Sequence, residues 1–155
     1  MCNKSIALHS RVILLLLCAC LLLPLAACGK PSDQTVYPFA DADFVDGSVG
    51  VFDTVPLRSL TAAEFDRAVA FLKELALRDA SGVADSYGGV FPCVQLRDAN
   101  GTEYRIYCDD LRGDGVFLLY CTCFTESGSE THKYYIDEAD MRAFIAMCRE
   151  MSDQA

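Results

Sequence analysis

Apolar residues recur at two spacings between residues 41 and 155, and these spacings predict helices and strands. Thr61 and Glu64 have the positions of a capping box, which marks the start of a helix. A helix of about seventeen residues is expected after it, because an apolar stripe follows at helical spacing: Phe65, Ala68, Val69, Leu72, Leu75 and Ala76. A final helix is expected after Asp137, with one apolar face: Met141, Phe144, Ile145, Cys148 and Met151.

Between the two helices, residues 90–97 and 102–108 have the pattern of a hairpin that turns at Gly101. One register sets Leu96 against Tyr104 on one face and Arg97 against Glu103 on the other. A two-residue Asn-Gly turn would instead set Leu96 against Arg105 and bring Cys93 opposite Cys108. We prefer the first register because it sorts apolar and polar residues onto separate faces. It places the two cysteines on opposite faces, which argues against a bridge between them.

Residues 116–124 and 132–136 flank a Ser-Gly turn and predict a second hairpin. One or two short strands are expected in residues 43–60, and the polar stretch 78–89 ends the first helix. The expected order is therefore β-(β)-α-β-β-β-β-α. This order predicts a single small α+β domain with a largely antiparallel sheet of about four to six strands and two helices.

The N-terminal residues have the layout of an export signal. Lys4 and Arg11 precede an uncharged segment, Val12 to Cys28, in which leucine dominates. Its end, Leu25-Ala26-Ala27-Cys28, resembles the lipobox of bacterial lipoproteins. This resemblance implies that residues 1–27 are removed and that the thiol of Cys28 takes a diacylglyceryl group. It also implies a membrane partner, reached through the lipid on Cys28, and a location on the extracytoplasmic side of the cell membrane.

An uncleaved transmembrane anchor is the alternative, because the uncharged segment is near the shortest length that spans a bilayer. In the lipoprotein interpretation, residues 28–40 are the lipidated cysteine and its tether, and 41–155 are the domain. That length suits one domain and is too short for a two-lobed solute-binding protein. The phrases Leu60-Thr61-Ala62-Ala63-Glu64 and Tyr135-Ile136-Asp137 loosely resemble small uncharacterised lipoproteins of Gram-positive bacteria, which implies an envelope location.

Charge and cysteine content narrow the function further. Removal of residues 1–27 takes away two basic residues and no acidic one, so the net charge changes from −9 to −11. Such a charge is unfavourable for nucleic acid, which is bound through Lys and Arg. Of the nine cysteines, five remain after cleavage and lipidation, so at least one is unpaired within the monomer: Cys93, Cys108, Cys121, Cys123 and Cys148.

Candidate chemistry is sparse. Cys121 and Cys123 fall on one face of a strand, where they can fill the core, form a disulfide, or act in metal or redox chemistry. A two-residue turn at Ser127-Gly128 would bring His132 opposite Cys123, which makes these three residues weak metal candidates. Two acidic segments, 41–47 and 109–114, are typical of solvated turns. No nucleophile elbow, zinc signature or phosphate-binding glycine loop is present, and no cofactor is expected.

These observations favour a non-catalytic binding or protein-interaction module over an enzyme, with an envelope protein as its possible partner. Tyr107, with Tyr120 or Tyr135, is expected on the solvent side of the sheet, where exposed aromatic residues suit protein contacts. The alternative is an envelope hydrolase or metal-dependent enzyme that uses the acidic loops or the Cys121, Cys123 and His132 cluster.

Overall fold

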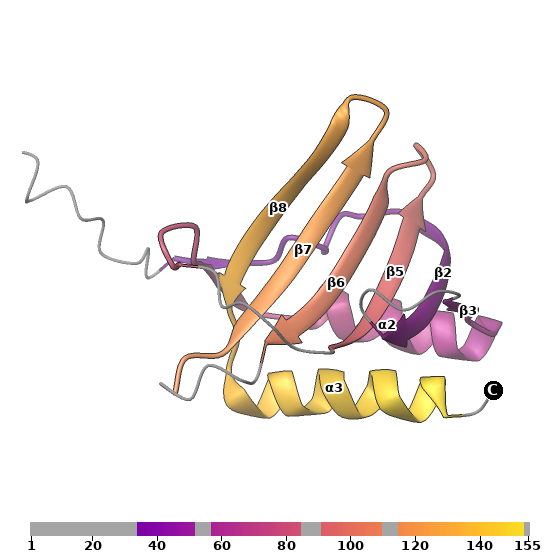
Figure 1. Cartoon of the computed structure of the whole chain (residues 1–155). Helices are drawn as coiled ribbons and strands as arrows, with labels where there is room; N and C mark the ends of the chain where they lie inside the picture. The colour runs from indigo at the N-terminus through magenta and orange to yellow at the C-terminus, as the bar shows by residue number, and fades with distance from the viewer. Residues whose placement is uncertain (1–33, 52–56, 85–90, 110–114, 154–155) are drawn as a thin grey trace, which may run out of the picture. The chain divides into compact units, whose positions relative to one another are not determined.

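The computed structural model describes residues 34–51, 57–84, 91–109 and 115–153 (Figure 1). These residues form an α+β domain with two helices and one antiparallel sheet of eight strands, more than the four to six expected. In chain order the elements are β1 (Thr35–Val36), β2 (Phe44–Val51), β3 (Arg58–Ser59), α2 (Ala62–Glu74), β4 (Leu77–Asp79), β5 (Pro92–Asp98), β6 (Glu103–Asp109), β7 (Leu118–Thr125), β8 (Gly128–Tyr135) and α3 (Glu138–Ser152).

The predicted signal segment, its alternative as a membrane anchor, and Cys28 all lie outside the described residues. Within the described ranges, no helix is long and apolar enough to cross a membrane.

The strands lie in the order β1-β4-β8-β7-β6-β5-β2-β3. The preferred register of the β5–β6 hairpin is confirmed, because Leu96 pairs with Tyr104 and Arg97 pairs with Glu103. Cys93 pairs with Tyr107 and therefore does not face Cys108 across the hairpin. Side-chain sorting was sufficient to identify this register because a shift by one residue would have moved charged residues into the core.

Two short strands, β1 and β4, account for the difference from the expected sheet. Strand β1 pairs with β4, and Phe39, which follows β1, is only 2% exposed. Residues expected in the tether thus contribute to both sheet and core. Strand β4 takes the place of the expected end of the first helix and the start of the polar stretch 78–89. Strand β3 is the second of the strands expected in residues 43–60 and pairs with Ser48 and Val49 of β2, while residues 52–56 lie outside the described ranges.

The second hairpin turns one residue earlier than expected. Thr125 pairs with Gly128, so Glu126 and Ser127 form the two-residue turn. His132 consequently pairs with Cys121 and not with Cys123, which pairs with Glu130. Gly128 has a φ of 140°, a backbone conformation that side-chain-bearing residues rarely adopt.

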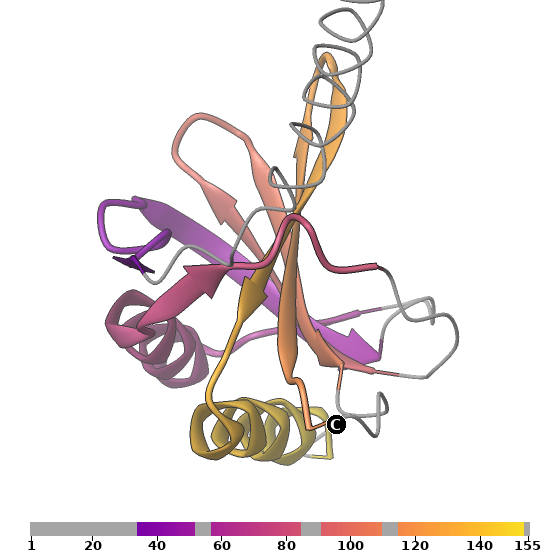
Figure 2. The ribbon, with the colours of Figure 1, turned by 90° about the vertical axis from the view of Figure 1, so that its left-hand side faces the viewer.

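Both helices cover the same face of the sheet, hereafter the helix face (Figure 2). Helix α3 contributes the apolar stripe that its sequence predicts, and all five of those residues are buried. Asp137 takes the N-cap position, although its side chain makes no capping hydrogen bond. The strands contribute the other side of this core: Val49, Val94, Leu96, Ile106, Cys108, Leu119 and Cys121.

Helix α2 begins as the capping box predicts but is 13 residues long, shorter than expected. The Thr61 hydroxyl accepts from the Glu64 amide, and the Glu64 carboxylate accepts from the Thr61 amide. Leu75 takes an extended conformation at the end of the helix, and Leu75 and Leu77 are both buried. Burial at a spacing of two is the pattern of a strand, and the chain continues directly into β4.

Strand β2 contains a bulge that decides which of its residues face the core. The register against β5 shifts between Phe44 and Asp46. The extra residue lets Phe44 join the helix-face core while Asp46 points to the opposite side. Gly47 follows, and a methyl group on it would lie 2.6 Å from Leu96 Cδ2 and 3.0 Å from the Gln95 carbonyl. The missing side chain at Gly47 therefore permits Leu96 and the backbone of β5 to pack closely.

We predict that Gly47→Ala destabilises the domain by roughly 1–3 kcal/mol, the usual cost of overpacking a core. Gly82→Ala is the matched control, because a methyl group there meets nothing within 4 Å. Denaturant unfolding measures the free energy of both variants. Equal stability of Gly47→Ala and the parent protein would show that this close contact is unimportant.

Candidate functional site

The three tyrosines proposed as an interaction surface share one face of the sheet, opposite the helices, hereafter the open face. Tyr107 pairs with Tyr120, and their rings stack with centroids 5.0 Å apart. Phe91 stacks on the other side of Tyr107 at 5.8 Å. Tyr135 lies near them, and the Arg78 guanidinium sits 5.5 Å from its ring centre.

Tyr120 is nevertheless buried, with 5% exposure, so the expectation that it faces solvent is wrong. Tyr107 and Tyr135 are half-buried. The cause is the segment after β4, where Ala80 and Val83 pack with the tyrosines in a second, smaller core. Lys133 fixes this segment, because its ammonium donates to the Val83 carbonyl and its own carbonyl accepts from the Ala80 amide.

Cys121 and Cys123 lie side by side on the helix face of β7, with their sulfur atoms 3.9 Å apart. The hydrogen bond between the two thiols raises the pKa of Cys121 and lowers that of Cys123. On the neighbouring strand β8, the His132 imidazole lies 3.8 Å from the Glu130 carboxylate of the same strand. Within the described ranges no disulfide joins the five cysteines: Cys93, Cys108, Cys121, Cys123 and Cys148.

The described residues contain no group of three or more His, Cys, Asp and Glu side chains placed to hold a metal ion. The acidic segment 41–47 enters strand β2 instead of forming a closed loop. Of the second acidic segment, Asp109 is buried at the end of β6, and Asp110 and Asp114 lie outside the described residues.

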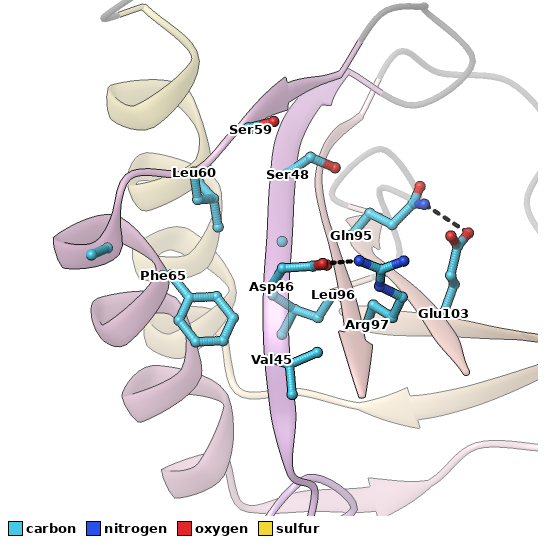
Figure 3. A pocket seen from close by; sticks show the side chains of 12 residues that line it. Val45, Asp46, Ser48, Ser59, Leu60, Phe65, Gln95, Leu96, Arg97 and Glu103 are labelled. Atoms are coloured by element: carbon cyan, nitrogen blue, oxygen red, sulfur yellow. Dashed lines mark hydrogen bonds and ion pairs between the residues drawn. The ribbon is translucent and has the colours of Figure 1, made fainter. Parts of the chain in front are cut away.

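A groove of about 490 Å³ lies where the edge of β2 meets the start of α2 (Figure 3). One wall is apolar and belongs to the space between β2 and the helix: Val45, Leu60, Phe65 and Leu96. The other wall is polar and belongs to the open face: Asp46, Ser48, Gln95, Arg97 and Glu103. Val45 stands at the lip with 52% exposure and is one of two large apolar side chains exposed among the described residues. The groove therefore offers an apolar contact beside charged groups.

A chain of hydrogen bonds positions the polar wall. The Glu103 carboxylate accepts from the side-chain Nε2 of Gln95 at 2.9 Å, and Arg105 donates to the side-chain Oε1 of Gln95 at 3.3 Å. The Arg105 guanidinium also lies 5.1 Å from the ring centre of Phe124 on β7. Arg97 forms an ion pair with Asp46, and about half of each side chain remains exposed. The charges of the groove are thus held in place and still reach solvent.

Arg58 fixes the outer rim of the groove. Its guanidinium makes a two-pronged contact with the Glu64 carboxylate, at 2.7 and 3.1 Å, and donates to the Met151 carbonyl at the end of α3. The hydrogen bond from Arg58, with those from Thr61, lowers the pKa of Glu64 to about 2. A second ion pair, Arg67 with Glu150, joins α2 to α3. This network ties β3, α2 and α3 together around the groove.

Comparisons of the sequence with protein-family models and with curated proteins, and of the structure with solved structures, give no match. The groove must therefore be interpreted from its own chemistry. Sequence patterns did not indicate it, because its walls join residues that are far apart in the chain. One signal was available, since the confirmed register of β5 and β6 already placed Gln95 opposite Arg105 and Arg97 opposite Glu103.

Two tyrosines give a matched test of the buried polar groups. Among the described residues, the buried Tyr120 hydroxyl has no hydrogen-bond partner, whereas the Tyr104 hydroxyl donates to Asp98 at 3.1 Å. Burial, and then the bond to Asp98, raises the pKa of Tyr104.

We predict that Tyr120→Phe leaves the free energy of unfolding unchanged or raises it, because it removes a buried hydroxyl that none of the described residues satisfies. Tyr104→Phe should lower that free energy by about 1 kcal/mol, because it leaves the Asp98 carboxylate without one donor. Thermal and denaturant unfolding of the two variants measure the contrast. If Tyr120→Phe costs more than Tyr104→Phe, this assignment of the two hydroxyls is wrong.

Proposed function

We propose that this protein is a lipoprotein, held by lipid on Cys28 at the outer face of a membrane, whose domain binds another protein through the groove. The single observation that carries the binding proposal is the groove itself, with an exposed apolar lip beside a fixed set of charges. The apolar segment and lipobox of the first 28 residues support the anchoring.

The groove suits a side chain of a protein partner better than a small solute. Binding sites for small ligands bury most of the ligand surface. Here Val45, Asp46 and Arg97 are each about half exposed, so a ligand between them would stay largely in water. An interface that places one apolar side chain in the groove can cover this rim with its own surface, and the charges then fix the orientation of the partner.

Lipidation is the first part to test. We expect Cys28→Ala to abolish incorporation of a labelled fatty acid and to release the protein from the membrane fraction, because stable anchoring needs acyl chains. Metabolic labelling followed by fractionation measures both effects. A variant that stays labelled on another residue, or an unlabelled parent protein, would contradict the lipoprotein proposal.

Binding is tested with two exposed apolar residues at opposite ends of the sheet. Val45 lies at the groove, whereas Tyr37, with 55% exposure, follows β1 at the other edge. We expect Val45→Asp to remove the partner that the parent protein captures from its own envelopes, and Tyr37→Asp to retain it. Both changes are at the surface and should alter the free energy of unfolding by about 0.5 kcal/mol or less.

Quantitative affinity capture of the tagged, full-length protein provides the measurement, and unfolding curves confirm that both variants fold. Equal capture by the parent and Val45→Asp would show that the groove is not the binding surface. If only Tyr37→Asp lost the partner, the binding surface would have to be assigned to the β1 edge of the sheet.

A further inference from the structure

The thiols of Cys121 and Cys123 form a pair that the groove does not use. Both project from the helix face of β7, two residues apart, with a sulfur–sulfur distance of 3.9 Å. Cys121 is buried at 3% exposure, while Cys123 is half-buried and lies nearer the surface. The pair therefore has one sulfur in the core and one within reach of a solute.

Strand geometry disfavours a disulfide between them. Residues two apart in an extended strand have Cα atoms about 6.8 Å apart, at the upper end of the range that a disulfide spans. Strand β7 is paired along its length with β6 on one side and β8 on the other, so it has little freedom to shorten. The two thiols are thus expected to stay reduced even in an oxidising compartment.

Their spacing suits a shared metal ion. Two thiolates about 2.3 Å from one ion lie about 3.8 Å apart at a tetrahedral angle and about 4.6 Å apart when the ion sits on the line between them. The observed 3.9 Å would therefore have to widen by about 0.7 Å for linear coordination, which small side-chain rotations can supply. Thiolates are soft ligands and select soft ions such as Cu⁺. A structural zinc ion would need four ligands, and the described residues offer no group of three. Cu⁺ forms stable complexes with only two thiolates, which is the number present.

We propose that Cys121 and Cys123 form a two-thiolate site for Cu⁺. Each thiol loses its proton to solvent as its sulfur binds the ion, so two protons are released for each Cu⁺ and the site gains one negative charge overall. Ile106 and Tyr104 lie opposite the two cysteines on β6 and shield the sulfurs on that side. The site is separate from the groove, because none of the residues that line the groove belongs to β7.

The test is a titration of the full-length chain with Cu⁺ against bicinchoninate, in detergent and without oxygen. Cys2, Cys18, Cys20 and Cys28 are replaced by serine in every sample, so that thiols of the N-terminal segment do not contribute. The parent chain, which carries only these four serine replacements, should withdraw one equivalent of Cu⁺ from bicinchoninate. Loss of a residue that only supports a metal ligand costs about 10–100-fold in affinity, so Cys123→Ala, which removes a ligand, should cost more than roughly 100-fold.

Cys148→Ala is the matched control, because Cys148 is a buried free thiol on α3 and should leave binding unchanged. Unfolding curves establish that each variant folds. Cys123 is substituted in preference to Cys121 because Cys123 is partly exposed, whereas Cys121 is buried. The proposal would be overturned if the parent and Cys123→Ala bound Cu⁺ with equal affinity. It would also be overturned if Cys148→Ala lost as much affinity for Cu⁺ as Cys123→Ala. X-ray absorption at the copper edge should show two sulfur neighbours, and a first shell of nitrogen or oxygen would also overturn it.

Discussion

Burial of one face of the sheet against α3 and α2 is the interaction on which the other features of this domain depend. Four long strands in succession, β5 to β8, place alternate residues on the helix face, and α3 contributes its apolar stripe to the same core. Because side chains alternate strictly, that burial also decides which residues occupy the open face. Val94 and Leu96 lie beneath the helices, and so Gln95 and Arg97 are directed to the open side.

The open face is then divided by a segment that returns across it. Ala80 and Val83 cover the end that carries the tyrosine stack, so these aromatic rings stabilise the fold. The other end keeps its polar residues, joined laterally from Arg105 through Gln95 to Glu103. At the margin of β2, Gly47 and the bulge bring this polar network beside the apolar residues Leu60 and Phe65. A packing requirement on one face therefore produces a fixed, two-sided groove at the edge.

Sequence patterns predicted the parts of this fold in which periodicity is long or chemically specific. The capping box at Thr61, the stripe of α3 and the register of β5 against β6 are of this kind. Strands β1 and β4 have two or three residues, too few for a period to be visible, and their burial depends on partners far along the chain.

The turn of the second hairpin was misplaced for a different reason. The observed register and the expected one differ by two residues in their pairing, and a shift of two leaves every side chain on the same face. Ser129, Glu130 and Thr131 are polar and exposed, so hydrophobic sorting gave no further information. The burial of Tyr120 was missed because the covering segment is distant in sequence. The groove was missed likewise, since β3 and the start of α2 form its rim only in the folded chain.

The most direct measurement of the central claim is site-specific photocrosslinking in intact cells, with a photoreactive residue at Ser59 or at Ser129. Both serines are exposed, but Ser59 lines the groove and Ser129 lies near the tip of the β7–β8 hairpin. The account predicts a crosslink from Ser59 to a single envelope protein and none from Ser129. The same products from both positions, or none from Ser59, would contradict recognition at the groove.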